Sequence, residues 1–370
     1  MKNLATTITF CALIGALTVA SMVNPVREYS DTENRALEQM PEFSLSALFD
    51  GSFTRDYESF ITDQFVARDA WIGLKNRVEL AIGKKDSGGV YFGKDGYLIE
   101  KHEYDAEQAE KNLAYLAEFL EAAAEYNPRV LIAPTASLIL ADKLPTNAPV
   151  WDQAAFLDRC AALDGFVDIR ETLTSHVDEY IFYRTDHHWT TLGAYYAYAD
   201  LCESLGITPL AEDSMEKVTL SDEFVGTLAA KVNLPTEFDQ IFTYSAGQTL
   251  SVNYNMGQIL TSSLIDESKL DSRDKYGAFL SGNQPIADVT TDVKNGKTLL
   301  VIKDSYAHCM APLLTNHYER VIFIDLRHLN MGVATYLALL ESEGTQVDDI
   351  VVLYNAENVT SDRNLHKLMR

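Results

Sequence analysis

Cysteine is scarce in this sequence. Only four cysteines occur, and none of them forms the C-x-x-C spacing typical of zinc or redox sites. Cys11 falls within an apolar N-terminal segment, which leaves three for the rest of the chain. Cys160 and Cys202 could pair, but small buried hydrophobic residues are the favoured interpretation. The cysteines therefore suggest neither a metal centre nor a redox centre.

Basic residues are also in short supply. The chain has 30 Lys and Arg against 54 Asp and Glu, a formal net charge of −24 over 370 residues. This balance argues against a nucleic-acid partner and against adhesion to anionic lipid through a basic patch. At 47% hydrophobic residues, the chain can bury the core of one large α/β domain with insertions or of two modest domains.

Charge is absent altogether from one stretch, Leu4 to Val23, which follows a single early lysine, Lys2. A basic residue ahead of an apolar run that can cross a bilayer is typical of a secretory signal or an uncleaved signal anchor. The imperfect cleavage signal favours the anchor. Lys2 would stay inside and the remaining chain would face outward. Residues 1–23 are thus the predicted anchor, and the polar, irregular residues 24–44 the predicted linker.

The rest of the chain, 45–370, is predicted to form one catalytic domain. Residues 45–83 carry apolar positions at helical spacing, and 88–99 are typical of a hairpin. Buried strands then alternate with helices, which predicts a doubly wound parallel sheet. Residues 215–295 are expected to be a β-rich insertion. The strands are expected at 130–133, 166–169, 299–302, 321–324 and 350–353, and the helices at 105–126, 156–163, 191–205 and from about 307 and 331.

One strand runs into a candidate nucleophile. Leu299–Ile302 lead directly into Lys303-Asp304-Ser305, after which a helix is expected. A serine at a helix N-terminus can use its own N–H and the helix dipole to stabilise developing negative charge. Asp or Ser at this position is also what an ordinary helix cap requires, and the cap is the favoured interpretation of this stretch alone.

A second loop supplies acid and base. In an extended segment Asp186 and His188 would point the same way, the carboxylate orienting the imidazole, while His187 points elsewhere and Trp189 packs. With Ser305, these residues are those of a hydrolytic triad. A metal site that uses Asp186, both histidines and His176 is the alternative, although adjacent histidines in a strand diverge.

The sequence resembles the DHHW family of Gram-positive surface proteins, which is related to the SGNH-like domains of alginate and other polysaccharide O-acetylation proteins. The resemblance rests mainly on Thr185–Ala194, with Asp186-His187-His188-Trp189, and on Lys303–His308. Further support comes from 33–35, 93–98 and 274–279.

The resemblance implies an SGNH-like fold with a permuted motif order, in which Asp-x-His precedes the serine. It implies Ser305 as nucleophile, His188 as base and Asp186 as orienter. Lys303 stands where these hydrolases usually have glycine, which is a departure from the motif.

Three further residues are candidates for the oxyanion hole or for substrate binding. Asn355 follows a strand and is either an oxyanion donor or a loop cap. Arg327 could bind a substrate oxygen, or pair with Asp325 or Asp304. Tyr306 either lines the pocket or packs in the core, and the same alternatives apply to His308.

The resulting hypothesis is a membrane-tethered, outward-facing enzyme, an O-acetyltransferase or O-acetylesterase of a cell-surface polysaccharide, that needs no cofactor. The transferase version implies a membrane-bound partner that exports acyl groups. The alternatives are a non-catalytic polysaccharide-binding or assembly factor and a metal-dependent hydrolase.

Overall fold

The computed structural model describes residues 2–30 and 35–370. Internal contacts divide the chain into two compact units. The first comprises Met1–Gly88 with Ala229–Pro235, and the second Gly89–Leu228 with Thr236–Arg370. The contacts place residues 45–88 in the first unit. The start of the catalytic domain at residue 45 stays a prediction. Of the supporting motif at 33–35, Glu33 and Asn34 lie outside the described residues.

The first unit is built mainly from helices. Its buried Asn76 donates to the Val232 carbonyl, 2.5 Å away, and accepts a hydrogen bond from Ser87, so the two chain segments of this unit are joined by polar contacts. The elements are α1 (Lys2–Val23), β1 (Tyr29–Ser30), β2 (Arg35–Ala36), α2 (Leu45–Phe49), α3 (Ser52–Asp63), α4 (Arg68–Ala81) and β3 (Asp86–Ser87).

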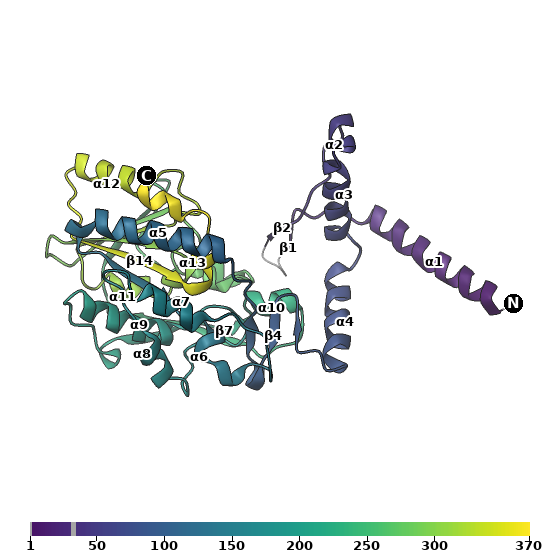
Figure 1. Cartoon of the computed structure of the whole chain (residues 1–370), viewed down its shortest axis with the longest axis horizontal. Helices are drawn as coiled ribbons and strands as arrows, with labels where there is room; N and C mark the ends of the chain where they lie inside the picture. The colour runs from purple at the N-terminus through teal and green to yellow at the C-terminus, as the bar shows by residue number, and fades with distance from the viewer. Residues whose placement is uncertain (1, 31–34) are drawn as a thin grey trace. The chain divides into compact units, whose positions relative to one another are not determined.

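The apolar N-terminal segment forms α1, drawn in purple in Figure 1. Its residues from Leu4 to Val23 are largely exposed rather than packed in a core. Within the described residues, this helix is long and apolar enough to cross a membrane.

The second unit is an α/β fold around a seven-stranded sheet of order β10-β9-β11-β13-β12-β14-β6. Strands β13, β12, β14 and β6 run parallel, with β12 pairing to both β13 and β14. The strands are β6 (Arg129–Ala133), β9 (Leu250–Tyr254), β10 (Ile259–Thr261), β11 (Ile286–Thr291), β12 (Thr298–Lys303), β13 (Arg320–Ile324) and β14 (Asp349–Asn355).

Helices cover both faces of this sheet. Leu299 and Val301 of β12 pack into the core that includes α9 and α11, whereas Leu300 and Ile302 pack into the core that includes α5, α12 and α13. Successive residues of the strand point to opposite faces of the sheet. Because helices cover both faces, every position is buried, which explains the unbroken apolar run of the strand. The bounds are α5 (Ala106–Ala122), α6 (Ala136–Ile139), α7 (Gln153–Cys160), α8 (Arg170–Ser175), α9 (Thr191–Ser204), α11 (Ala311–Leu314), α12 (Val333–Ser342) and α13 (Ala356–Ser361).

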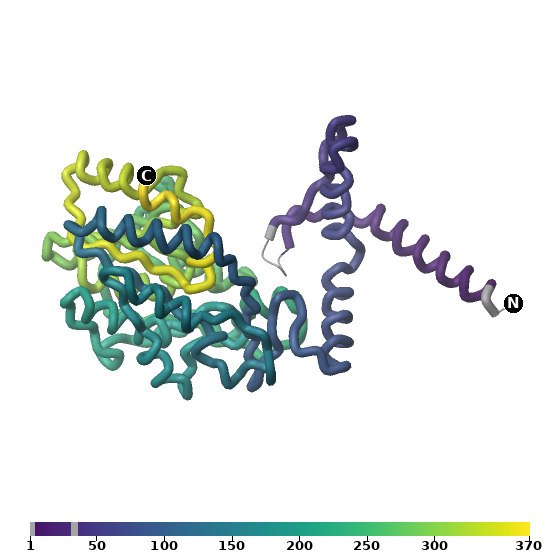
Figure 2. Tube along the Cα trace, viewed as in Figure 1, coloured from purple at the N-terminus to yellow at the C-terminus, as the bar shows by residue number. Residues whose placement is uncertain are grey.

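The trace in Figure 2 returns at its C-terminal end to α12, where the Thr335 N–H donates to the carbonyl of Arg370. Near the start of the second unit, β4 (Val90–Phe92) and β5 (Leu98–Glu100) pair antiparallel around a turn at Lys94–Gly96, as predicted for a hairpin.

Two expectations about the sheet are wrong in detail. The sheet is mixed rather than parallel, because β9, β10 and β11 from the predicted β-rich segment add antiparallel to the edge at β13. Residues 166–169 do not form a strand of the sheet; Phe166 makes only an isolated bridge to Val130. The β-rich segment also holds β7 (Glu216–Phe224) and β8 (Asp239–Ser245), which pair with each other. Helix α10 spans Thr227–Val232.

Candidate active site

The turn that carries Ser305 follows the central strand β12. Asp304 caps this turn, and its Oδ1 accepts the N–H of Tyr306 at 2.8 Å. The expected helix is a single 3₁₀ turn, Ser305–Ala307, followed by the four-residue α11. So short a turn has little dipole, and the oxyanion argument is reduced to the Ser305 N–H itself. That N–H donates no hydrogen bond within the part of the chain that the structure describes.

Asp304 ties the serine turn to the neighbouring strand. Its Oδ2 accepts the backbone N–H and the Nδ2 of Asn355, both at 2.9 Å, and the Nδ2 of Asn358 at 2.8 Å. Asn355 also caps α13, since its Oδ1 accepts the N–H of Asn358. The structure thus shows Asn355 as a cap and as a partner of Asp304, and its role as an oxyanion donor stays a prediction.

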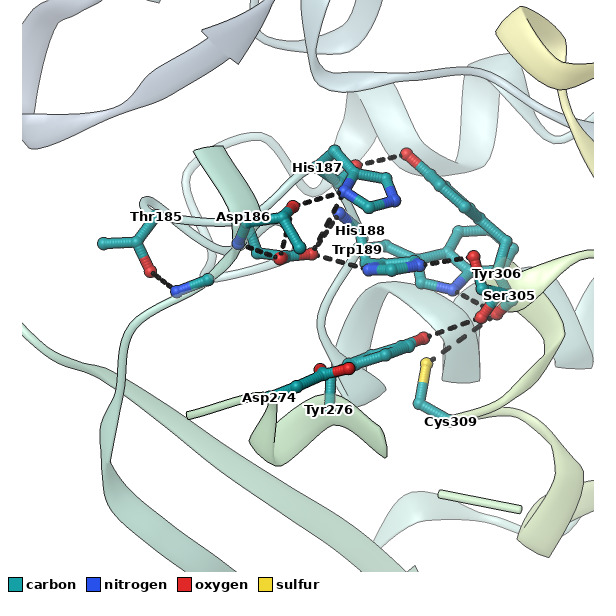
Figure 3. A network of polar contacts seen from close by, with 12 residues as sticks. Thr185, Asp186, His187, His188, Trp189, Asp274, Tyr276, Ser305, Tyr306 and Cys309 are labelled. Atoms are coloured by element: carbon teal, nitrogen blue, oxygen red, sulfur yellow. Dashed lines mark hydrogen bonds and ion pairs between the residues drawn. The ribbon is translucent and has the colours of Figure 1, made fainter. Parts of the chain in front are cut away.

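The structure brings Ser305, His188 and Asp186 together. His188 Nε2 lies 2.8 Å from Ser305 Oγ, and His188 Nδ1 lies 2.5 Å from Asp186 Oδ1 (Figure 3). His188 is only 4% exposed and Asp186 2%. In the tautomer that donates Nδ1–H to Asp186, Nε2 accepts the serine O–H, which is the alignment needed to activate a nucleophile.

A threonine holds the outer oxygen of Asp186, and a glycine packs against the same side chain. The Thr227 N–H and hydroxyl donate to Asp186 Oδ2 at 2.7 and 3.0 Å. Gly226 packs so closely that a Cβ there would lie 2.3 Å from the Asp186 Cβ. Sequence analysis missed both residues; their only signal is a Gly-Thr pair within the predicted β-rich segment 215–295.

Asp239, also missed, organises the start of the same loop. It is 1% exposed and accepts hydrogen bonds from the N–H and hydroxyl of Thr185, at 2.8 and 2.6 Å, from the Arg184 N–H at 3.1 Å, and from the Tyr180 hydroxyl. These bonds satisfy a buried carboxylate and hold the loop before Asp186. The two segments are about 50 residues apart in sequence, and nothing near Asp239 marks this role.

The two titratable groups of the site have perturbed pKa values. Burial and the neighbouring His187 lower the pKa of His188 below its ordinary value, against the opposing effect of Asp186. Burial alone would raise the pKa of Asp186, but His187, His188 and the hydrogen bonds from His188 and Thr227 together hold it well below its usual range. The pair is therefore a neutral imidazole beside an ionised carboxylate at neutral pH.

The expectation that His187 points away is wrong. Residues 184–188 form bends rather than an extended strand, so the two imidazole rings lie 3.8 Å apart between centroids. His187 Nδ1 lies 2.8 Å from Thr227 Oγ1 and 3.6 Å from Asp186 Oδ1. Among the described residues, Asp186, His187 and His188 form a group whose ligand atoms could surround a cation. His176 is not part of that group; it contacts Glu179 and Tyr196 instead.

The remaining candidates have specific contacts. Trp189 is buried and donates Nε1–H to the Tyr306 carbonyl at 2.9 Å, so it packs as predicted. Tyr306 is itself buried, and its hydroxyl donates to the His187 carbonyl. Arg327 pairs with Asp325 through Nε at 2.9 Å and Nη2 at 2.6 Å, one of the pairings considered above. These contacts favour supporting roles, and direct substrate contact stays a prediction.

His308 belongs to a buried polar pair. Its Nε2 lies 2.8 Å from the ammonium of Lys303, the residue that departs from the usual glycine. Lys303 also lies 3.5 Å from Asp325, and burial is the main reason that its pKa falls to about 8. The lysine thus belongs to a satisfied network beneath the serine turn rather than to an open pocket.

Comparison with known proteins confirms the resemblance to the DHHW family. Residues 155–324 match the sequence profile of the DHHW protein family, a range that includes the Asp186–His188 loop and Ser305. No curated protein matches the chain in sequence.

Solved structures share its fold. A DHHW family protein from Eubacterium siraeum is 23% identical, with a TM-score of 0.65, over 77% of this chain and 96% of that one. Bacillus cereus PatB1 with a sulfonyl adduct is 17% identical, with a TM-score of 0.59, over 74% and 96%. A further structure of Bacillus cereus PatB1 is 17% identical, with a TM-score of 0.58, over 72% of this chain and 96% of that one.

Proposed function

We propose that the chain is an extracytoplasmic, membrane-tethered, serine-dependent acyl-ester enzyme on an SGNH-like scaffold with permuted motif order. The observation that carries this proposal is the 2.8 Å approach of His188 Nε2 to Ser305 Oγ, with Asp186 on the far nitrogen of the same ring. These three side chains come from two loops, 117 residues apart in sequence for the serine and its base.

The mechanism follows from this geometry. Ser305 Oγ attacks the carbonyl carbon of an acyl ester while His188 Nε2 takes the hydroxyl proton. Asp186 stabilises the imidazolium that forms. We propose the Ser305 N–H as the oxyanion donor, and its lack of a partner among the described residues supports this role. His188 returns the proton to the leaving alcohol, and an acyl-serine remains.

The second half-reaction decides between hydrolysis and transfer. His188 removes a proton from water or from a sugar hydroxyl. The oxygen of that water or hydroxyl attacks the acyl-serine, and the proton returns from His188 to Ser305 Oγ as the enzyme is regenerated. We propose an acetyl group as the acyl group and a cell-surface polysaccharide as substrate, as the family resemblance implies. A transferase of this kind would depend on a membrane partner that delivers acyl groups outward.

Asn355, Arg327 and Tyr306 are proposed as supporting residues of this reaction. Asn355 fixes Asp304 next to the nucleophile, and Tyr306 fixes the loop of the base through the His187 carbonyl. Arg327 is 27% exposed in its side chain and keeps its planar guanidinium at the end of β13, where it could reach a substrate oxygen.

The test is turnover of a small acetyl ester by the detergent-solubilised full chain and by Ser305→Ala, each with and without a chelator. We expect Ser305→Ala to lose on the order of 10⁴-fold or more in kcat, because the nucleophile is removed, and the chelator to have no effect. A labelling experiment with an aryl sulfonyl fluoride supports the same test, since this electrophile traps activated serines without needing an acceptor.

The outcomes separate the competing functions. Equal turnover in both proteins would exclude Ser305 as the nucleophile. Turnover lost to the chelator would favour the metal-dependent alternative at Asp186, His187 and His188. An absence of both turnover and sulfonyl labelling in the unmodified chain would favour a binding or assembly factor.

A further inference from the structure

Residues 274–279 support the family resemblance but have no role in the mechanism above. The segment forms a 3₁₀ turn, Lys275–Ala278, capped by Asp274, which accepts the Gly277 N–H. The turn directs Tyr276 into the core, where it is 4% exposed. This tyrosine contacts both the base and the nucleophile.

The Tyr276 ring lies flat against the imidazole of His188. The ring centroids are 3.9 Å apart and the planes differ by 12°. His187 covers the opposite side of the imidazole, with its centroid at 3.8 Å and an interplanar angle of 37°. Figure 3 shows His188 between the two rings, its Nε2 edge toward Ser305. The imidazole therefore has little freedom to tilt.

The hydroxyl of the same tyrosine reaches the nucleophile. It donates to the backbone carbonyl of Ser305 at 3.1 Å, a carbonyl that also accepts the N–H of His308 at 3.2 Å. Burial raises the pKa of Tyr276 well above its ordinary value, so the hydroxyl stays protonated at any working pH. One side chain thus restrains the plane of the base and the backbone of the serine.

We propose that Tyr276 is a positioning residue that sets the approach of His188 Nε2 to Ser305 Oγ. The ring fixes the imidazole plane, and the hydroxyl fixes the turn that presents the serine. This inference rests on the proposed triad. It predicts that the ring matters more than the hydroxyl. The Ser305 carbonyl keeps a second donor, whereas among the described residues the other rings against His188, those of His187 and Tyr306, are tilted rather than flat.

A purely structural role makes a different prediction. Loss of a buried tyrosine lowers stability wherever it lies, but only a residue that covers His188 alters the titration of the imidazole. Burial is the main cause of the lowered pKa of His188. Removing the covering ring admits water, so the acid limb of kcat/KM must move up toward the ordinary histidine value.

The experiment compares Tyr276→Phe and Tyr276→Leu in the full chain, with Tyr318→Phe and Tyr318→Leu as matched controls. Tyr318 is 1% exposed and its hydroxyl donates to Asp349 at 2.9 Å. Asp349 begins β14 and Tyr318 precedes β13, so the control lies at the N-terminal ends of the parallel strands. Ser305 follows the C-terminal end of β12. Both pairs lose the same groups from the core.

We expect Tyr276→Phe to lose roughly 2- to 10-fold in kcat with an unchanged pH profile, as for one neutral hydrogen bond. Tyr276→Leu should lose on the order of 100-fold in kcat with KM changed by less than about 2-fold. Its acid limb should shift upward, and its rate of sulfonyl labelling should fall in parallel. The Tyr318 variants should lose thermal stability and keep the kinetic constants.

Two results would overturn the inference. One is Tyr276→Leu with the kinetic constants and pH profile of the unmodified chain; the other is a loss that the Tyr318 variants share at equal loss of stability. Should Tyr276→Leu not fold, a Tyr276→Phe variant with unaltered kcat and labelling rate would count against the hydroxyl contact. Ser305→Ala separates the two proposals: if it retains turnover, the triad itself is wrong and the role of Tyr276 falls with it.

Discussion

At the residue scale, the catalytic proposal depends on the protonation state of His188. Only the neutral imidazole can accept the serine proton, and burial beside His187 favours that form. Asp186 opposes this effect but keeps the Nδ1–H tautomer that leaves Nε2 facing Ser305. The site is thus prepared for base catalysis at neutral pH.

This argument predicts the pH dependence of the reaction. Because protonated His188 is inactive and its folded-state pKa is lowered, kcat/KM should fall as the pH falls, with an apparent pKa below about 6.5. The measurement is kcat/KM on a neutral ester from about pH 4 to about pH 8, a range centred near the ordinary pKa of histidine. Circular dichroism at each pH separates titration from acid unfolding. An acid limb above the ordinary histidine value in a folded protein would contradict the assignment.

At the element scale, the loop at Gly226 and Thr227 supports the acid of the proposed triad. Two donors from Thr227 hold Asp186 Oδ2, and only a residue without a Cβ permits that approach. Without them the carboxylate would keep, among the described residues, only the hydrogen bonds of its Oδ1 with the N–H and Nδ1 of His188. The element therefore fixes the acid of the triad from outside its motif.

Gly226→Ala should accordingly lower kcat on the order of 100-fold with little change in KM, because its methyl displaces Asp186. Gly15→Ala in α1 is the control, since an added Cβ there meets nothing within 4 Å. Steady-state kinetics and thermal unfolding of both variants test the prediction. A Gly226→Ala protein with kinetics like those of Gly15→Ala would show that Asp186 does not depend on this contact.

Short motifs made much of the site predictable from sequence. The apolar run of β12 leads into Ser305, and Asp186 and His188 are two residues apart, so the residues of the proposed triad could be named without a structure. Its supports could not be, because Asp239 and Gly226 act across about 40 to 55 residues through contacts that no local pattern encodes. Strand direction was likewise hidden, since the residue pattern of β11 does not reveal whether this strand pairs parallel or antiparallel with β13.

At the scale of the whole molecule, the contacts separate a first unit that begins with α1 from the unit that holds the triad. The residues of the site, Ser305, His188, Asp186 and Thr227, all belong to the second unit. The chain as a whole carries a surplus of acidic residues, which argues against attachment to anionic lipid through a basic patch. Attachment to a membrane would therefore depend on α1.

This division predicts how the chain behaves in cells. The full chain should stay in the membrane pellet after alkaline extraction, because the segment from Leu4 to Val23 is apolar and long enough to span a bilayer. A chain that begins at Asn24 should move to the soluble fraction. Intact mass of the extracted protein should still include residues 1–23. Protease added outside intact protoplasts should degrade the unit that holds the proposed triad, because Lys2 is predicted to stay inside. A mature chain that lacks this segment would instead identify it as a cleaved signal peptide. Protection of the second unit from external protease would overturn the outward orientation, on which a surface polysaccharide substrate depends.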